Sequence, residues 1–258
     1  MKAIPNLSLV LPAYNEGQTI GLVIERTDSV AKQTGLRYEL VVVDDGSEDN
    51  TSTEVRCFAG KNGHVRVVGY TDNFGKGFAL KTGFFHSLGD LIIFLDSDTD
   101  IEPDRVVDFV DTLKDADLVI ASKRHPESVV DACLSRRFLS YGFNLLVRLL
   151  VGLDIKDTQA GLKAVKRSAL KRVFPLLSVK RYAFDVELLA ISKLLGLKVV
   201  ELPVNLHLNG KFKMKEALRM FLDVLGIAYR LRIVKFYQRR LEACSRWSKW
   251  ANIKAEKK

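Results

Sequence analysis

Short apolar segments alternate with helical segments through the first half of the chain, and this alternation restricts the fold more than any other feature. The expected strands are Leu7–Leu11, Leu40–Val43, Val65–Val68, Leu91–Leu95 and Leu118–Ala121. The helices expected between them are Gln18–Ala31, Thr51–Ala59, Gly77–Ser87 and Pro103–Leu113. Parallel strands need helical crossovers, and strands that are apolar on both sides must be covered on both faces. The pattern therefore predicts an α/β fold with a mostly parallel central sheet and helices on both faces.

Polar and acidic residues directly follow three of these strands. The first strand is followed by "PAYNEG", the second by "DDGSEDNT" and the fourth by "DSDTD". Because parallel sheets bind ligands at the carboxyl ends of their strands, we expect these segments to meet in one binding site. Helix capping explains Ser47, Asp49 and Asn50 more simply, but it does not require Asp44 and Asp45 at the strand end.

The segment "DSDTD" places three carboxylates, Asp96, Asp98 and Asp100, at alternate positions just past a buried strand. Ser97 keeps the turn compact, and hard oxygen ligands of this kind suit Mg²⁺ or Mn²⁺. Protein carboxylates rarely fill a magnesium shell, so we expect the phosphates of a nucleoside diphosphate to complete it. A calcium loop is excluded because no glycine follows Asp100 and Pro103 interrupts the later ligand positions.

A glycine-rich turn, "NFGKGFALKTGF", precedes the third expected helix and places Lys76 between Gly75 and Gly77. Backbone N–H groups at such a helix start can bind an anion. Close packing of this helix on the sheet explains the glycines equally well. The phosphate-binding pattern GxxxxGK[ST] is absent from the sequence.

Composition indicates a globular protein with an ordinary core, since 47% of the residues are apolar and 28% are charged. The cysteines, Cys57, Cys133 and Cys244, form no CxxC pair, which predicts a reducing compartment and neither zinc nor disulfides. The first apolar run is short and is broken by Pro5 and Pro12, so we expect no signal peptide. No uncharged apolar run reaches about 18 residues, so we expect no transmembrane helix.

The second half of the chain has a different pattern. Leu134–Leu153 is mostly apolar and is followed by a turn-like segment, "DIKDTQAGLKAV". Helices are expected around Ser168–Phe174 and over Phe184–Leu195, and a short strand over Lys198–Leu202. No domain boundary is expected before about residue 210. Residues 1–210 are therefore predicted to form one domain, and residues 211–258 a basic amphipathic segment.

The last 48 residues hold the whole excess of positive charge. Residues 211–258 contain 14 Lys/Arg and 4 Asp/Glu, whereas the entire chain has a net charge of +9. Within them, Lys213–Val234 has an amphipathic helical pattern. A second basic stretch follows with Phe236, Tyr237, Trp247 and Trp250, and Trp and Tyr prefer membrane interfaces. We therefore expect peripheral or monotopic contact with an anionic membrane surface. The alternative for the first of these helices is docking on the protein's own sheet. No nucleic-acid-reading module accompanies the basic tail, so nucleic acid is not an expected partner.

Several motifs together resemble those of a known family. "LVLPAYNEGQTI", "ELVVVDDGSEDNT", "NFGKGFALKTGF" and "FLDSDTD" occur in the order and spacing of family 2 glycosyltransferases. The resemblance implies the nucleotide-sugar-binding GT-A fold. In the second half, "RRFLSYGFNLLVRLL", "DTQAGLKAV" and "RYAFDVELL" resemble dolichyl-phosphate glucose synthases and, more loosely, dolichyl-phosphate mannose synthases.

The resemblance implies roles for residues of a donor site. Pro12, Tyr14, Glu16 and Asp44 would hold the base and ribose, with Asp45 supporting that pocket. The remaining implied donor and metal residues belong to the acidic and glycine-rich segments: Lys76, Asp96, Ser97 and Asp98, with Asp100 where the mannose synthases have a glutamine that reaches the metal. Asp98 is the expected direct metal ligand.

Further roles are implied for residues after the fifth strand. In the families a Ser-Arg supplies a cation to the phosphates, whereas this chain has Lys123 in that place and Arg124 next to it. The sequence leaves open which of the two has this role. Arg136 matches the arginine expected to meet the acceptor phosphate.

Two acidic segments complete the implied site. Asp157, Thr158 and Gln159 match the segment that lines the sugar or acceptor pocket. Asp185 and Glu187 match an acidic pair with a catalytic role. The helix dipole explains the acidic pair equally well, because it favours anions at a helix N-terminus.

The activity implied by the resemblance is inverting transfer of a hexose onto dolichyl phosphate or another polyprenyl phosphate at the cytoplasmic face of a membrane. Glucose synthases indicate UDP-glucose as donor and mannose synthases indicate GDP-mannose, and a family 2 transferase with another lipid or glycan acceptor is a further alternative. Polymerising members of the family usually carry QxxRW and membrane spans, neither of which occurs here. A nucleotidyltransferase would need a basic glycine-rich loop where this chain has "LPAYNEG".

Overall fold

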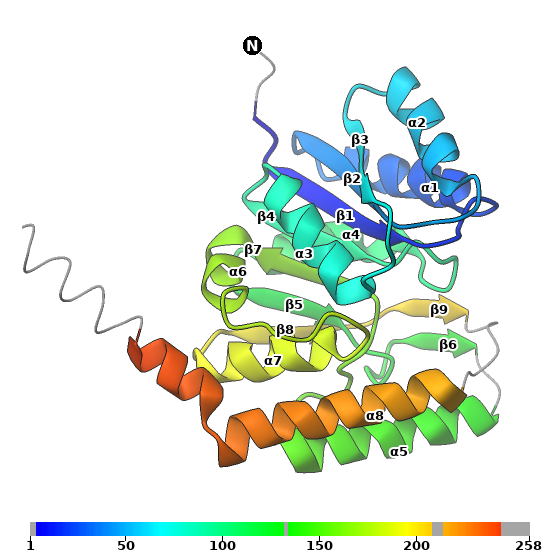
Figure 1. Ribbon diagram of the computed structural model, residues 1–258. Helices are drawn as coiled ribbons and strands as arrows, with labels where there is room; N and C mark the ends of the chain where they lie inside the picture. The colour runs from blue at the N-terminus through cyan, green and yellow to red at the C-terminus, as the bar shows by residue number, and fades with distance from the viewer. Residues whose placement is uncertain (1–3, 132–133, 208–213, 244–258) are drawn as a thin grey trace, which may run out of the picture.

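The computed structural model describes residues 4–131, 134–207 and 214–243. A seven-stranded sheet forms its centre, in the order β3-β2-β1-β4-β7-β5-β8 (Figure 1). Its strands are β1 (Leu7–Ala13), β2 (Tyr38–Asp45), β3 (Val65–Tyr70), β4 (Leu91–Leu95), β5 (Leu118–Ala121), β7 (Leu162–Lys166) and β8 (Val199–Leu202). All neighbouring strands are parallel except β7, which runs antiparallel to β4 and β5. The predicted mostly parallel α/β sheet is confirmed.

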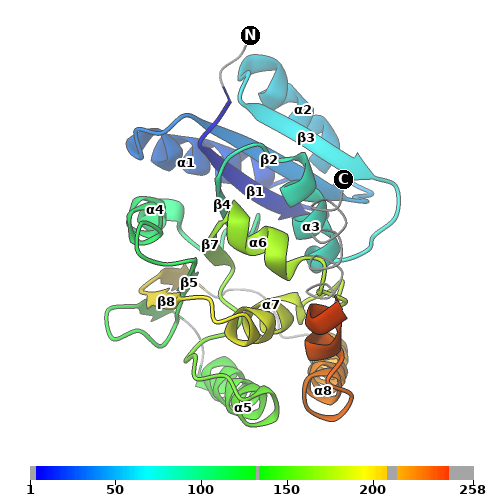
Figure 2. The same cartoon turned by 90° about the vertical axis from the view of Figure 1, so that its left-hand side faces the viewer.

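Helices cover both faces of the sheet (Figure 2). One face packs against α1 (Ile20–Gln33), α2 (Thr51–Lys61) and α4 (Val106–Thr112), which follows the 3₁₀ turn Pro103–Arg105. The other face packs against α3 (Lys76–His86), α6 (Arg167–Val173) and α7 (Phe184–Leu194), with α5 (Leu134–Val151) and α8 (Met214–Ala228) beyond them. Successive residues of each strand alternate between the two cores, as in Leu9 and Val10 of β1.

Strand β7 was not predicted, because "DTQAGLKAV" looked like a turn. Its residues alternate between the two faces of the sheet: Leu162 and Ala164 enter the core under α4, and Val165 enters the other core. The lysine at position 163, which disguises this alternation, is buried and paired with an acid from α7. A second, two-stranded sheet of β6 (Val129–Asp131) and β9 (Asn205–His207) was also not predicted.

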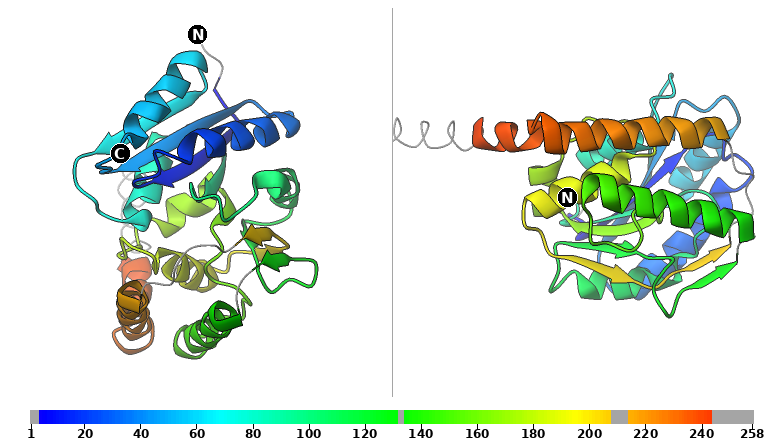
Figure 3. Two further views of the ribbon diagram at one scale, coloured as in Figure 1. Left: turned by 90° about the vertical axis from the view of Figure 1, so that its right-hand side faces the viewer. Right: turned by 90° about the horizontal axis from the view of Figure 1, so that it is seen from below.

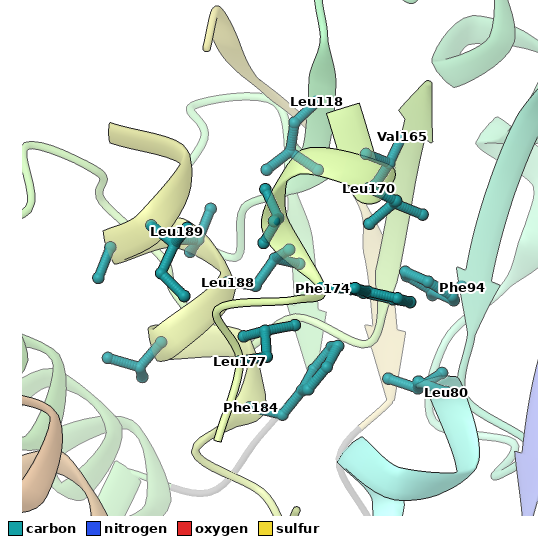
Figure 4. Packing of buried hydrophobic residues seen from close by; sticks show 14 of the residues in the cluster. Leu80, Phe94, Leu118, Val165, Leu170, Phe174, Leu177, Phe184, Leu188 and Leu189 are labelled. Carbon is teal, nitrogen blue, oxygen red and sulfur yellow. The ribbon is translucent and has the colours of Figure 1, made fainter. Parts of the chain in front are cut away.

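Aromatic rings fill the core beneath the second helical face (Figure 4). Phe174 lies between Phe94 of β4 and Phe184 of α7, with ring centroids 6.4 and 6.1 Å apart. Phe84 of α3 meets Phe174 edge to face at 4.6 Å. Such contacts hold α7 against β4, and this positions the first turn of α7 beside the carboxyl end of that strand.

The C-terminal helix α8 packs onto the body of the protein. It contacts α5 and α7, and Val224 and Ile227 are fully buried in the same core as the sheet residues. A π-helical turn, Tyr229–Ile233, follows. Tyr237 beyond it was expected at a membrane interface but is fully buried, because its ring packs into the protein core. Side chains from α8 to Tyr237 in the predicted C-terminal segment thus belong to this core. The sequence left two alternatives for the first amphipathic helix, membrane contact or docking on the protein. The buried face of α8 is docked on the protein.

Helices α5 and α8 lie side by side along one side of the molecule (Figure 3). In the described part of the chain, no helix has both the length and the apolar character that crossing a bilayer requires. The predicted interfacial residues Trp247 and Trp250 lie outside the described residues, as do Cys133 and Cys244.

Candidate active site

A cavity of about 530 Å³ opens at the carboxyl ends of β1, β2 and β4, where the sequence predicted a site. It brings together ten of the predicted residues: Pro12, Tyr14, Glu16, Asp45, Lys76, Asp96, Ser97, Asp98, Gln159 and Asp185. Its remaining wall comes mainly from the glycine-rich turn, the segment before α7 and α8. This volume lies in the range of small-molecule binding pockets.

Asp45 fixes the glycine-rich turn at the edge of this cavity. Its carboxylate accepts hydrogen bonds from the backbone N–H groups of Phe74 and Gly75, at 3.0 and 2.8 Å, and from the Tyr70 hydroxyl at 2.7 Å. Gly75 has a φ of 97°, which a residue with a side chain rarely adopts. Lys76 begins α3 immediately after this turn and therefore enters the cavity in a fixed position.

A chain of alternating charges runs from the cavity into the core. The Lys76 ammonium lies 2.8 Å from Asp96 Oδ1 and 3.6 Å from Asp185 Oδ2. Lys163 Nζ, in a side chain that is 3% exposed, lies 3.0 Å from Asp185 Oδ1. Burial raises the pKa of Asp185, but Lys163 and Lys76 outweigh it and hold this pKa below its ordinary value. Asp185 is therefore an ionised carboxylate at the cavity wall.

Asp98 lines the cavity close to two other carboxylates, Asp96 and Asp100. Burial and the neighbouring charges of Asp96 and Asp100 raise its pKa to about 7, against a smaller lowering by Lys76. Ser97, between Asp96 and Asp98, donates a hydrogen bond to the Pro12 carbonyl at 2.6 Å. This bond connects the turn after β4 to β1. This carboxylate is accessible at the cavity wall and provides a position for a cation.

The oxygen donors here fit Mg²⁺ or Mn²⁺ only in part. No three acidic, histidine or cysteine side chains within the described residues are arranged to hold a metal ion by themselves. Asp96 and Asp98 both line the cavity, whereas Asp100 is not part of its lining and donates its backbone N–H to Asp98 at 3.3 Å. The donor set therefore fits a cation whose shell is completed by substrate oxygens.

Gly161 leaves room for the Asp96 carboxylate. A Cβ at this position would lie 2.0 Å from Asp96 Oδ2, and the Gly161 carbonyl accepts the Asp96 N–H at 3.1 Å. Gly161, just before β7, thus positions Asp96 both by the space it leaves and by its backbone hydrogen bond.

We expect Gly161→Ala to displace the Asp96 carboxylate and to reduce the turnover rate by about a hundredfold, because misplacing an active-site group by about 1 Å can cost that much. Steady-state kinetics measures the loss, and thermal unfolding checks that the variant folds. Gly60→Ala is the control, since a Cβ at Gly60 meets nothing within 4 Å. Full activity of Gly161→Ala would show that the position of Asp96 is unimportant.

Residues at the open rim of the cavity are partly exposed. Tyr14 is exposed, and Glu16 accepts a hydrogen bond from the Thr19 hydroxyl at 2.6 Å. Burial raises the pKa of Glu16, and the Thr19 hydrogen bond opposes that shift. Gln159 reaches the cavity from the loop before β7 and contacts Met220 of α8. An aromatic ring, a carboxyl group and an amide at one rim can bind a base and a sugar.

Other predicted residues lie outside the cavity lining. Asp44 is buried at the end of β2 and accepts the Ser47 N–H at 2.9 Å, which closes the following turn. Asp157 accepts the Lys123 N–H at 2.9 Å, and its backbone N–H donates to Glu201. Thr158 next to it is buried. The roles predicted for these residues stay predictions.

The two candidate phosphate cations differ in their surroundings. Lys123 Nζ lies 3.6 Å from Asp157. Arg124 donates to the carbonyls of Lys156 and Ser140 and lies over the Tyr141 ring at 5.3 Å. Arg124 thus joins the loop after β5 to α5. Arg136 lies on the first turns of α5, and its side chain lies outside the described residues.

Several cavity residues were not predicted. They come from the glycine-rich turn, the segment before α7 and helix α8: Asn73, Arg181, Tyr182, Arg219, Met220 and Asp223. Arg181 and Tyr182 belong to the quoted motif "RYAFDVELL", which could have indicated them, but no role was predicted for either. Nothing in the sequence indicates that α8 returns to this site.

A family comparison agrees with this geometry. The profile described as "Glycosyl transferase family 2" matches residues 8–174, which include β1 to β7 and every strand end around the cavity. The chain belongs to glycosyl transferase family 2. This glycosyltransferase was identified correctly from its sequence motifs, and it is an enzyme that transfers hexoses.

Curated relatives of the enzyme extend over more of its length than the family profile. A dolichyl-phosphate beta-glucosyltransferase of Trichomonas vaginalis is 34% identical over 86% of this chain and 70% of its own. Proteins of the same name from Saccharomyces cerevisiae and Mus musculus are 31% and 35% identical. They share 89% and 77% of this chain, which spans 76% and 66% of their lengths.

Solved structures support the fold of this glycosyltransferase. Glucosyl-3-phosphoglycerate synthase from Mycobacterium tuberculosis, in complex with UDP, superposes with a TM-score of 0.66 at 24% identity and covers 87% of this chain and 79% of its own. Another structure of that synthase contains Mn²⁺, UDP and glucosyl-3-phosphoglycerate. These likenesses establish the GT-A fold of the enzyme.

Proposed function

We propose that this enzyme transfers glucose from UDP-glucose to dolichyl phosphate or a related polyprenyl phosphate, with inversion at the anomeric carbon, at the cytoplasmic face of a membrane. The position of α8 carries this proposal. Met220 and Asp223 of this helix line the donor cavity, while Leu218 and Leu222 on the same helix are exposed to solvent. One helix therefore adjoins both a nucleotide-sugar site and an apolar surface suited to a lipid.

The names of the curated relatives support the choice of glucose and of a dolichyl acceptor. The proposed cytoplasmic face agrees with the cysteine usage, since Cys57 is a free and exposed thiol. A GDP-mannose donor remains the alternative for the same fold, and so does another lipid or glycan acceptor.

In this proposal Asp96 and Asp98 hold Mg²⁺ or Mn²⁺, together with the diphosphate oxygens of the donor. The cation would act as a Lewis acid on the leaving nucleoside diphosphate. Lys76 adds a fixed positive charge beside Asp96 in the same cavity. A preorganised cation stabilises charge that develops on the leaving group.

The acceptor needs no strong base in this reaction. A phosphate monoester has its second pKa near about 6 and is mostly ionised at pH 7. Asp185 is therefore assigned to orient sugar hydroxyls from the cavity wall, as an ionised hydrogen-bond acceptor. Arg136 on α5 is proposed to meet the acceptor phosphate, with Lys123 or Arg124 contacting the donor phosphates. Direct attack from the opposite face of the sugar inverts its configuration.

An acceptor panel tests this proposal. Purified protein, Mg²⁺ and labelled UDP-glucose are incubated with polyprenyl phosphate, unphosphorylated polyprenol or 3-phosphoglycerate. Of the three acceptors, we expect only polyprenyl phosphate to give organic-extractable label, because the phosphate is the nucleophile. Label that appears only in a water-soluble product with 3-phosphoglycerate would refute the lipid acceptor.

The proposed membrane contact uses the exposed apolar side chains of α5 and α8. Tyr141, Leu145 and Leu149 recur at helical spacing on α5, and Leu149 is 68% exposed. Leu222 on α8 is 58% exposed. The two helices are adjacent, and the basic residues after α8 complement an anionic surface.

We expect the double variant Leu149→Asp/Leu222→Asp to lose most of its binding to anionic vesicles, because each change puts a charge into the lipid contact. Vesicle sedimentation measures binding, and calorimetry with UDP and Mn²⁺ checks the donor site. Leu22→Asp on α1, where the side chain is 44% exposed on the opposite face of the sheet, is the matched control. Equal vesicle binding by the double variant and wild type would refute this membrane face.

A further inference from the structure

Glu187, which the resemblance paired with Asp185 in a catalytic role, is fully buried on α7 and outside the cavity lining. Its Oε2 accepts the backbone N–H groups of Ser178 and Val179 at 2.9 and 2.7 Å, and its Oε1 accepts the Ser178 hydroxyl at 2.6 Å. One carboxylate thus fastens the start of the loop 178–182. That loop supplies Arg181 and Tyr182 to the cavity.

The same carboxylate also binds the C-terminal segment. The Tyr237 hydroxyl donates to Glu187 Oε1, and Arg230 lies 3.5 Å from that oxygen. Arg230 Nε in turn donates to the Tyr237 hydroxyl at 3.0 Å. Tyr237 is fully buried and lies just beyond Lys235, whose φ of 50° turns the chain back onto the body.

On its other side the loop 178–182 contacts the glycine-rich turn. The Lys180 carbonyl accepts the Phe78 N–H at 3.0 Å. A Cβ at Gly75 would meet Arg181 Cγ at 2.8 Å, and one at Gly77 would meet the Lys180 carbonyl at 3.0 Å. Lys76, between these glycines, is the cation that pairs with Asp96 in the cavity.

These contacts form one continuous path from the C-terminal segment to the donor site. We propose that Glu187 is a positioning residue through which Arg230 and Tyr237 hold the loop 178–182, and with it the Lys76 turn, in the geometry that binds the nucleoside diphosphate. The role replaces the catalytic one predicted for Glu187. This proposal for Glu187 depends on the proposed function only for the identity of the nucleotide that binds.

The C-terminal segment also faces outward. Tyr229 and Ile233 in the π-helical turn are exposed, whereas Tyr237 four residues further on is buried against Glu187. A lipid surface that contacts Tyr229 and Ile233 would therefore contact the segment whose position Glu187 transmits to the donor site.

The test compares two tyrosines of this segment. Tyr237→Phe removes one hydroxyl from Glu187 and keeps the ring in the core, whereas Tyr229→Phe removes a hydroxyl from an exposed ring. Calorimetry with UDP and Mn²⁺ should give a dissociation constant several-fold higher for Tyr237→Phe and an unchanged value for Tyr229→Phe. Val110→Ala, in the core under α4, controls for lost stability, since it should lower the melting temperature without weakening UDP binding.

Hydrogen exchange provides a readout that does not depend on the donor. Without nucleotide, the amides of Ser178, Val179 and Phe78 should exchange faster in Tyr237→Phe than in wild type or Val110→Ala. Unchanged exchange and unchanged UDP affinity in Tyr237→Phe would overturn the proposal, as would equal weakening by Val110→Ala. Wild-type protein that binds no UDP would contradict the proposed function, while faster exchange at these amides would still support the positioning role.

Discussion

Asp98→Ala is expected to reduce the turnover rate on the order of a hundredfold or more, with the fold intact. The carboxylate lies just past β4 and is accessible, and it accepts the Asp100 N–H at 3.3 Å, so its removal should cost the fold little. Desolvation and the neighbouring acids raise its pKa to about 7. Its removal costs the proposed cation a direct ligand, and each tenfold loss of rate corresponds to about 1.4 kcal/mol of transition-state stabilisation.

Initial rates at saturating UDP-glucose measure this loss, and EDTA should abolish the wild-type reaction. Asp108→Ala is the matched control, because Asp108 is an exposed carboxylate on α4 that lies 3.5 Å from Arg105. The control should retain full activity. Full activity of Asp98→Ala in EDTA would contradict a metal-assisted reaction.

Lys76→Met is expected to have the second-largest effect, again on the order of a hundredfold in kcat/KM. Methionine keeps much of the side-chain volume but removes the ammonium that lies 2.8 Å from Asp96. The donor diphosphate loses a fixed cation, and Asp96 loses its closest positive partner. Affinity for UDP should fall with the rate, since Lys76 lines the cavity before the acceptor arrives.

Lys114→Met provides the comparison for Lys76→Met. Lys114 also pairs with an aspartate at 2.8 Å, but on the exposed surface, where removing the pair should change little. Rates and UDP affinities are measured for both variants. If Lys76→Met kept the wild-type UDP affinity and rate, the assignment of Lys76 to the donor site would be refuted. Lys76 would then be only a structural partner of Asp96.

Local patterns were sufficient to predict the parallel half of the fold. β4 and β5 have the predicted bounds, because buried parallel strands are continuous apolar runs bounded by polar residues. The antiparallel strand β7 was missed because Lys163 interrupts its apolar pattern. That lysine is tolerated in the core only because Asp185, 22 residues later in the sequence, pairs with it. A pairing of this kind depends on tertiary structure and leaves no local signal.

The strand-end part of the site was predictable for the same reason. Asp45, Asp96 and Asp98 follow strands directly, and parallel strands place such residues at one edge of the sheet. The wall contributed by α8 was not predictable, because amphipathic periodicity shows that a helix has an apolar face but not which surface covers it. The buried position of Glu187 was not predictable for a related reason: its partners Ser178 and Tyr237 come from segments whose packing the sequence does not reveal.

The most direct test of the account supplies the purified enzyme with polyprenyl phosphate, Mg²⁺ and either labelled UDP-glucose or labelled GDP-mannose, and measures label in the organic phase. We predict extractable label from UDP-glucose, dependent on polyprenyl phosphate and abolished by EDTA, and none above background from GDP-mannose. Label from GDP-mannose alone would assign the enzyme to the mannose donor. No lipid-linked label from either donor would contradict the proposed reaction itself.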